Sequence, residues 1–350
     1  MSVEGKKKFM EAIWYGILSV LIGTYILLDG YDLGAGVVYL FFADSDDERQ
    51  KVLKSIRSIW DANEVWLIAF VGLASVVFPV YSQALFDNFG GYILLFFLFL
   101  LLKTISFNLM LVYKNKSLIY RILGYIFGFI NTMLVVFISL IFANILRGIF
   151  AADTGGHIRF VSKHFSPFSD KAGLFDWFTL LTGAVIFIGI LIHGLGWVVL
   201  KNSGAFNRKL KKTIQRLAFL ELILLLLFLI SWYFLHPGII GNYWSYPFLF
   251  VFPVLAFIAL SGLIGIRTYP GENKAFILST NLIIFSWISV MIAIYPNFIM
   301  SLDGTRLTAF NAGFDNPERF YIKWWILTIG ILLLGYSIVI HKYIKGEEPR

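Results

Sequence analysis

Four carboxylates lie inside two stretches of the sequence that are otherwise apolar enough for hydrocarbon. Asp29 and Asp32 belong to "LLDGYDLGAG", and Asp61 and Glu64 belong to "IWDANEVWLI". An ionised carboxylate inside a bilayer costs about 2.5 to 3.5 kcal/mol on insertion scales, so such acids indicate a functional site by default. Burial and like-charge neighbours both favour the protonated form of a carboxyl group, which suits a group that takes up and releases protons. The chemistry that these residues predict is proton relay.

The spacing of the four acids predicts that they converge. Within each pair the residues are three apart, which puts both side chains on one face of a helix. If Asp46 marks the tip of a hairpin, Asp32 lies fourteen residues before it and Asp61 lies fifteen after it. Two antiparallel helices then hold both pairs at nearly the same depth. We predict one buried acidic patch, with the glycines of "DGYDLGAG" allowing close approach of the helices.

A second interpretation keeps the acids at the cytoplasmic water boundary. There they would cap the second helix and pair with the basic residues of the intervening turn, Arg49, Lys54 and Arg57. We favour the functional interpretation for Asp29 and Asp61. Glu64 fits both interpretations equally, because its longer side chain can reach a polar rim.

The elements that must position these acids are membrane-spanning helices. The chain has 350 residues, of which 59% are hydrophobic and 14% charged, and its mean hydropathy is +0.79. Apolar runs near the roughly 20 residues that a helix needs to cross hydrocarbon recur along the whole chain. We predict an all-α integral membrane protein with about nine transmembrane helices, arranged as two bundles of four and one extra helix. The expected spans are 9–41, 59–82, 89–113, 119–146, 176–200, 214–235, 246–267, 275–297 and 322–343.

A polar loop from about residue 147 to residue 175 divides the predicted helices into two domains. We expect residues 1–150 to form the first transmembrane bundle with the acidic hairpin. Residues 151–350 are expected to form the second bundle plus the final helix.

The positive residues predict the orientation in the membrane rather than a nucleic-acid partner. The formal net charge is +8, and the basic residues gather in the turns after the first, third and fifth spans and in the tail. By the positive-inside rule these turns and the C-terminus face the cytoplasm, and the N-terminus lies outside. Lys6, Lys7 and Lys8 disagree with this orientation but are outnumbered by the loop residues.

Two further absences narrow the chemistry. The sequence has no cysteine, which excludes thiolate nucleophiles, disulfides and cysteine-ligated metals. It also has no G-x-x-x-x-G-K-[ST] motif, so pumping driven by its own ATP hydrolysis has no support.

Several motifs in the first two hundred residues resemble, in order, subunit II of the cytochrome bd quinol oxidases. "LDGYDLGAG" is similar to the family's D-G-[FY]-D-[LM]-G signature, and "IWDANEVWLI" is similar to W-D-G-N-[EQ]-V-W-L. "DDERQ" lies between them and resembles D-[ED]-E-R. Further on, "FPVYSQAL" resembles F-P-x-x-Y, and "LIHGLGWVVLKNSG" resembles H-G-x-x-W-L-x-x-K-[TS]. The combination is specific to this family.

The resemblance implies a multi-pass subunit of a quinol oxidase in a prokaryotic cell membrane, part of an aerobic respiratory chain. Its partner would be a homologously folded subunit I that carries haem b and haem d and oxidises quinol, while the complex reduces oxygen to water with cytoplasmic protons. No cofactor is expected on this chain. Membrane lipid, quinone and a small accessory subunit are further expected partners.

The resemblance also implies roles for individual residues. The residue that matches Asp61 is a candidate for the family's cytoplasmic proton path, so Asp61 would be the principal relay group. Asp29, Asp32 and Glu64 would support it, and Trp60 and Asn63 would shape the path.

The third predicted span departs from the family pattern. Family members usually show an Arg followed five residues later by an acid, whereas "LLKTISFNLM" has Lys103 and Asn108. Lysine keeps the charge but loses the planar fork of arginine, and an amide cannot relay a proton as an acid does. If that acid belongs to the path, this chain must use water, a residue of subunit I or a different route.

His193 is the one histidine deep within a predicted span. His157 and His164 fall in the outer loop, His236 at a helix end and His341 in the tail. A lone buried histidine more often bonds neighbouring helices than ligates a metal. We therefore interpret His193 as a packing partner and not as a haem ligand.

Two competing functions remain open at this point. A proton-coupled secondary transporter would use the acids for coupling and predicts inverted repeats with paired interrupted helices; only the first span has a marked glycine-rich stretch. A purely structural subunit of the oxidase would use the buried acids for assembly alone.

Overall fold

The computed structural model describes residues 3–57, 63–113, 117–148, 151–153, 158–160, 175–301 and 304–313. Most of these residues are helical, as the long apolar runs of the sequence predict. The α-helices are α1 (Val3–Phe41), α2 (Asp46–Ile56), α3 (Glu64–Val77), α4 (Pro79–Val112), α5 (Ser117–Arg147), α6 (Trp177–Lys201), α7 (Ala205–Leu235), α8 (Gly241–Ser245), α9 (Val251–Ile264) and α10 (Asn273–Ile294).

Short elements connect the helices. Two antiparallel hairpins occur, one of β1 (Ala151–Asp153) and β2 (Ile158–Phe160), the other of β3 (Asn297–Met300) and β4 (Arg306–Thr308). The β3–β4 register contains an irregularity between Asn297 and Ile299. Single 3-10 turns lie at Pro237–Ile240, Pro247–Phe250 and Ile266–Thr268.

Seven helices of the described part are long and apolar enough to cross a membrane: α1, α4, α5, α6, α7, α10 and the stretch Pro247–Ile264 that contains α9. Helix α3 is apolar but has only 14 residues. The expected last span, 322–343, lies outside the described residues. A mostly helical membrane fold is therefore confirmed, whereas the count of nine and the grouping into two bundles of four stay predictions.

The boundary between the second and third predicted spans was placed wrongly. The sequence predicts spans at 59–82 and 89–113, but α3 ends at Val77 and α4 already begins at Pro79. A proline at the first position of a helix loses no hydrogen bond, because the N–H groups of the first turn have no partner within the helix. The polar residues of "YSQALFDN" therefore continue α4 instead of forming a loop, and the Asn88 amide donates to Ala84 O at 2.7 Å.

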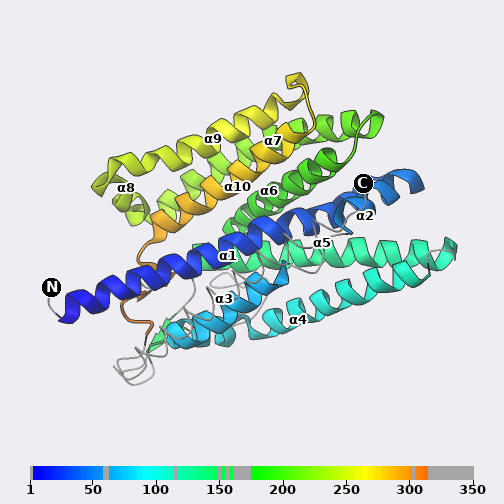
Figure 1. Ribbon diagram of the computed structural model, residues 1–350. Coiled ribbons are helices and arrows are strands. Elements are labelled where there is room, and N and C mark those ends of the chain that lie inside the picture. Colours follow the sequence, from blue (N-terminus) through cyan, green and yellow to red (C-terminus); the bar gives the residue numbers. More distant parts are fainter. Residues whose placement is uncertain are drawn as a thin grey trace.

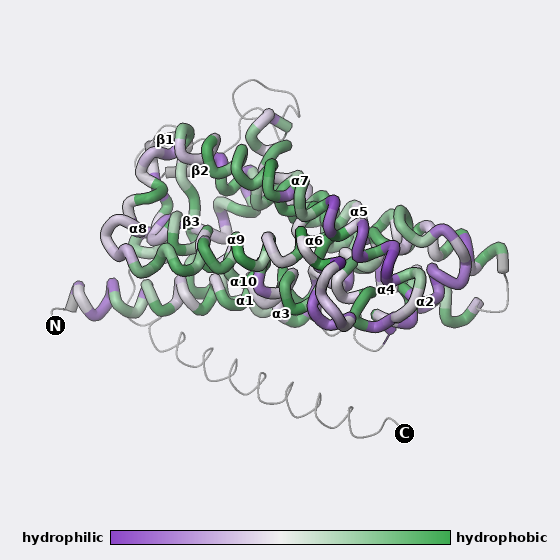
Figure 2. The backbone as a smooth tube through the Cα atoms, turned by 90° about the horizontal axis from the view of Figure 1, so that it is seen from above, coloured by the Kyte–Doolittle hydropathy of each residue, from purple (hydrophilic) through white to green (hydrophobic). Residues whose placement is uncertain are grey.

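Helix α1 starts earlier than predicted and lies at the centre of the molecule. It has 39 residues, about 58 Å at 1.5 Å per residue, so it is longer than a bilayer core of roughly 30 Å. Figure 1 shows α1 (blue) between the group of α6, α7, α9 and α10 on one side and the group of α3, α4 and α5 on the other. In Figure 2 apolar residues dominate the long helices, and hydrophilic residues gather around α2.

Glycines allow α1 and α6 to touch backbone to backbone. A Cβ atom on Gly194 would fall 2.2 Å from the carbonyl carbon of Gly34, and one on Gly34 would fall 2.5 Å from Ile190 O. Neither distance is possible for a real side chain. This contact sets the position of the C-terminal half of α1, where Asp29 and Asp32 lie.

Candidate functional site

Three of the predicted acids surround one lysine in the interior of the protein. The ammonium nitrogen of Lys103 lies 3.3 Å from Asp29 Oδ1 and 3.5 Å from Asp32 Oδ2. It also lies 3.3 Å from Glu64 Oε1. The side chains of Lys103, Asp29 and Asp32 are 0–1% exposed, whereas that of Glu64 is 24% exposed. We call these four residues the acid cluster; its partly open side is at Glu64.

Each member of the acid cluster is placed by its helix. Asp29 and Asp32 share one face of α1 through their spacing of three. Glu64 is the first residue of α3, where the positive end of the helix dipole stabilises a carboxylate. Lys103 lies on the buried side of α4, while its neighbours Leu101 and Leu102 are exposed. The cluster therefore depends on the packing of three helices and not on one local motif.

Acceptors outnumber donors in the acid cluster. Three carboxyl groups face one ammonium group, so full ionisation would leave an excess of two negative charges in the interior. Asp29 Oδ2 and Asp32 Oδ1 are buried and have no hydrogen-bond partner among the residues that the structure describes. An unpaired charge at such a site is costly. The free carboxyl oxygens therefore need a proton or a bound water to be satisfied.

Side chains from two other helices fix the backbone of α1 next to the cluster. The Asn63 amide donates to Leu28 O at 3.0 Å. His193 Nε2 lies 3.1 Å from Leu27 O, and its Nδ1 lies 2.9 Å from the Ser279 hydroxyl. Because a carbonyl only accepts, Nε2 carries the proton and Nδ1 accepts from Ser279. The bond to Leu27 links α6 to α1, and the bond to Ser279 links α10 to α6.

The remaining predicted residues are not part of the cluster as it is described. Asn108 is exposed on α4, and its amide donates to Thr104 O at 3.0 Å. Five residues turn an α-helix by about 500°, so Asn108 points well away from Lys103. Trp60 and Asp61 lie outside the described residues. The role of all these residues in proton relay stays a prediction.

Sequence reasoning missed two features of the interior. Lys103 was noted only as a departure from a family pattern, although a lysine inside an apolar run indicates a buried counter-charge. The same rule applies to Glu221 in α7, which is 4% exposed and lies within "FLELILLLLF". Both signals were available in the sequence. No group of three or more potential metal ligands occurs within the described ranges.

The fold is that of a respiratory oxidase subunit. The chain aligns with a chain of "The structure of bd oxidase from Geobacillus thermodenitrificans" with a TM-score of 0.71, covering 97% of this chain and 100% of that chain at 14% identity. A profile of the family "Cytochrome bd terminal oxidase subunit II" matches residues 10–344. The chain therefore belongs to the cytochrome bd terminal oxidase subunit II family.

Two relatives show how far the sequence similarity extends. "Cytochrome bd-I ubiquinol oxidase subunit 2" of Escherichia coli (strain K12) is 26% identical over 220 residues, which are 61% of this chain and 55% of the relative. "Cytochrome bd ubiquinol oxidase subunit 2" of Bacillus subtilis (strain 168) is 22% identical over 209 residues, 59% of this chain and 58% of the relative. The match thus spans little more than half the length of either relative.

Proposed function

We propose that this chain is subunit II of a membrane quinol:oxygen oxidoreductase and that its acid cluster belongs to the cytoplasmic proton path for the reduction of oxygen to water. The observation that carries the proposal is the single Lys103 ammonium within 3.5 Å of three carboxyl groups. Family membership supplies the reaction, and the cluster supplies this chain's part in it. The partner would be a haem-bearing subunit I that oxidises the quinol, with lipid, quinone and a small accessory subunit as further components.

The described histidines support placing haem b and haem d on the partner. They are His193 and His236. Both ring nitrogens of His193 are engaged with Leu27 O and the Ser279 hydroxyl, and His236 Nε2 lies 2.8 Å from Arg147 O. An axial ligand needs a free ring nitrogen that points at the iron, so His193 does not fit as it stands.

The cluster offers a simple way to move protons. Glu64 is its most exposed member and begins α3, three residues after Asp61, so we assign proton entry to this side. A proton passes from there to the free oxygens of Asp29 and Asp32. Lys103 holds a positive charge beside all three acids, which keeps them from retaining every proton. A group that both accepts and returns protons needs this balance.

The test uses the complex of this chain with its haem-bearing partner. Asp29→Asn and Asp61→Asn keep the side-chain volume but remove the titratable proton, so we expect normal haem content and oxygen consumption slower by about tenfold or more. Asp87→Asn, an exposed acid on α4, and Asn108→Asp should change little. Native turnover in both acid variants would refute the relay. Joint loss of haem and subunits would instead favour the purely structural subunit.

The structure removes the main sequence argument for a proton-coupled secondary transporter, which was an interrupted first helix. It predicts interrupted helices around a substrate site, and the glycine-rich stretch of the first span was its candidate. In the structure α1 runs without a break from Val3 to Phe41 through that stretch. We therefore keep the oxidase subunit as the proposed function.

We further propose that the N-terminus lies outside and the C-terminus in the cytoplasm. Ion pairs join the three basic turns at one end of the molecule: Lys209 lies 2.6 Å from Asp44 and 2.9 Å from Glu48, and Arg121 pairs with Asp46. Single cysteines at Lys212 and His157 test this cleanly, because the native chain has none. A membrane-impermeant thiol reagent on intact cells should label only position 157, and the reverse pattern would overturn the orientation.

A further inference from the structure

One stripe of α1 changes its chemistry at Tyr25. Leu18 and Ile22 line a cavity of about 310 Å³ between the helices, together with side chains of α3, α4, α5, α6, α7 and α10. Asp29 and Asp32 follow on the same stripe at helical spacing and belong to the acid cluster. Tyr25 lies between the two kinds of surface. Tyr25 therefore borders both the cavity and the cluster.

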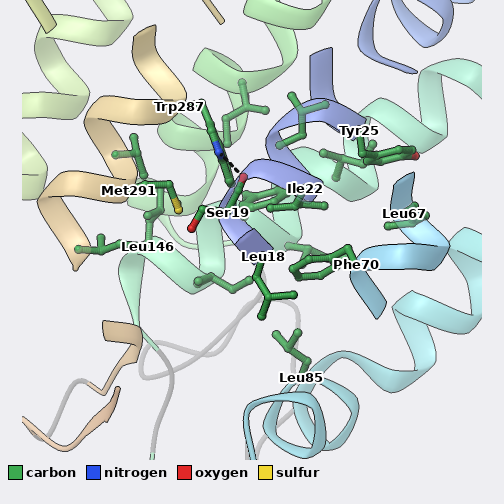
Figure 3. A pocket seen from close by; sticks show the side chains of 18 of the residues that line it. Leu18, Ser19, Ile22, Tyr25, Leu67, Phe70, Leu85, Leu146, Trp287 and Met291 are labelled. Atoms are coloured by element: carbon green, nitrogen blue, oxygen red, sulfur yellow. Dashed lines mark hydrogen bonds between the residues drawn. The ribbon is translucent and has the colours of Figure 1, made fainter. Parts of the chain in front are cut away.

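The Tyr25 ring and its hydroxyl face different surroundings. The ring lines the cavity, whose wall is almost wholly apolar. Figure 3 shows the hydroxyl oxygen directed away from Ser19 and Trp287, which mark the opposite part of the wall. The side chain is 1% exposed, and it lies within electrostatic reach of the carboxyl groups of Asp29, Asp32 and Glu64.

The Tyr25 hydroxyl, a hydrogen-bond donor, lies beside the Asp29 carboxyl group, which has a free acceptor oxygen. The Tyr25 hydroxyl and Asp29 Oδ2 are both buried with no other partner among the described residues, and the hydroxyl lies close to the Asp29 carboxyl. The two residues are four apart, so their side chains are neighbours on the helix surface. Buried polar groups are almost always paired, directly or through one ordered water. A hydrogen bond between the two groups, direct or through one water, would satisfy both.

We propose that Tyr25 is a positioning residue of the proton path: its hydroxyl donates a hydrogen bond to the Asp29 carboxyl, and its ring closes the apolar cavity against the acid cluster. This inference rests on the proposed function for its effect on turnover, but the hydrogen bond itself does not. The hydroxyl supplies the donor that the cluster lacks. The ring keeps the charged side of α1 separate from a cavity where an ion has no partners.

The variant Tyr25→Phe in the assembled oxidase tests the proposal. It keeps the ring and removes only the donor, so we expect normal haem content with a several-fold loss of turnover. Tyr15→Phe is the matched control, because Tyr15 lines the same cavity but its hydroxyl donates to Met291 O instead; it should behave like the native enzyme. Native turnover in Tyr25→Phe would refute a role of the hydroxyl in the path.

Infrared difference spectra test the hydrogen bond independently of turnover. The carboxyl band that disappears in Asp29→Asn should shift in frequency in Tyr25→Phe and stay unchanged in Tyr15→Phe. If Tyr25→Phe does not assemble, 3,5-difluorotyrosine at position 25 keeps the shape with a stronger donor and should shift the same band in the opposite direction. An unshifted band overturns the hydrogen bond. A shifted band with native turnover in Asp29→Asn would instead refute the proposed relay while the bond stands.

Discussion

The acid cluster and Glu221 are two ways of burying carboxyl groups in the same membrane protein. The cluster gathers three acids around Lys103. Glu221 lies alone in the wall of the cavity, where its Oε2 has no partner among the described residues and its Oε1 is next to Gly189. A lone carboxylate in hydrocarbon is far costlier than a neutral carboxylic acid. Glu221 is therefore held with its proton, whereas the cluster can exist in more than one charge state.

The difference teaches that depth alone does not make an acid useful for proton transfer. A group that never loses its proton cannot relay one. The positive charge of Lys103 lowers the free-energy cost of ionising Asp29 and Asp32. No basic side chain pairs with Glu221 within the described part of the chain. Substitutions at the two sites should consequently differ in size and in kind.

The largest effect is expected for Lys103→Met. This change removes the counter-charge of three acids and leaves a buried pair broken, which typically costs about 3 to 5 kcal/mol. The complex in detergent should melt at a clearly lower temperature and lose haem. Lys103→Arg keeps the charge and should recover most of the stability. A melting temperature equal to the native one in Lys103→Met would mean that the acids are already neutral without the lysine.

A smaller effect on stability is expected for Glu64→Gln. The Glu64 side chain is 24% exposed, so the lost ion pair is partly screened and costs about 1 kcal/mol or less. Oxygen consumption should nevertheless fall, because Glu64 forms the open side of the cluster. Glu64→Asp should retain more activity than Glu64→Gln. If both variants turn over at the native rate, protons enter elsewhere.

Glu221→Gln should change stability by no more than about 1 kcal/mol, because it removes no ion pair and keeps the volume of a neutral side chain. Turnover should also stay near the native value. Thermal melting and oxygen consumption of the same preparation measure both. A strong loss of either would show that Glu221 ionises and would remove the contrast with the acid cluster.

The smallest effect is expected outside the membrane, at Asp46 in the first turn of α2. A hydrogen bond from Arg121 lowers the pKa of this exposed carboxyl below its ordinary value of 3.8. Because the pKa of Asp46 is lower in the folded state than in the unfolded state, the ion pair with Arg121 stabilises the fold at pH values above 3.8. This stabilisation is lost as the pH falls through the lower pKa of the folded state. Asp46→Asn should therefore alter melting only slightly near neutral pH, and the difference should vanish in acid.

The sequence predicted which residues matter better than it predicted their surroundings. The spacing of three within "DGYD" placed Asp29 and Asp32 on one face, and that holds because helix geometry is local. The partner of these acids could not be found in the same way. Lys103 lies 74 residues further on than Asp29, and only the packing of α4 against α3 and α5 decides that it points inward.

The boundary error has a similar cause. Polar residues near Asp87 suggested a loop, because in isolation a polar stretch between apolar runs favours one. The structure continues α4 through them, since Asn88 bonds back to its own helix and Pro79 already supplies a start. Tyr25 was overlooked for the opposite reason. A tyrosine in a membrane helix is common, and its position between the cavity and the acid cluster appears only when seven helices are packed.

The distance in sequence between Asp29 and Lys103 also bears on the order in which the chain is made. When α1 leaves the ribosome its two aspartates have no counter-charge. Helix α4 is completed only after some 70 further residues, which takes about 4 to 14 seconds at about 5–20 residues per second. A helix that carries two acids without a counter-charge partitions poorly into lipid. We therefore expect α1 to stay at the insertion machinery until α4 arrives, so that the two aspartates enter the bilayer already beside their counter-charge.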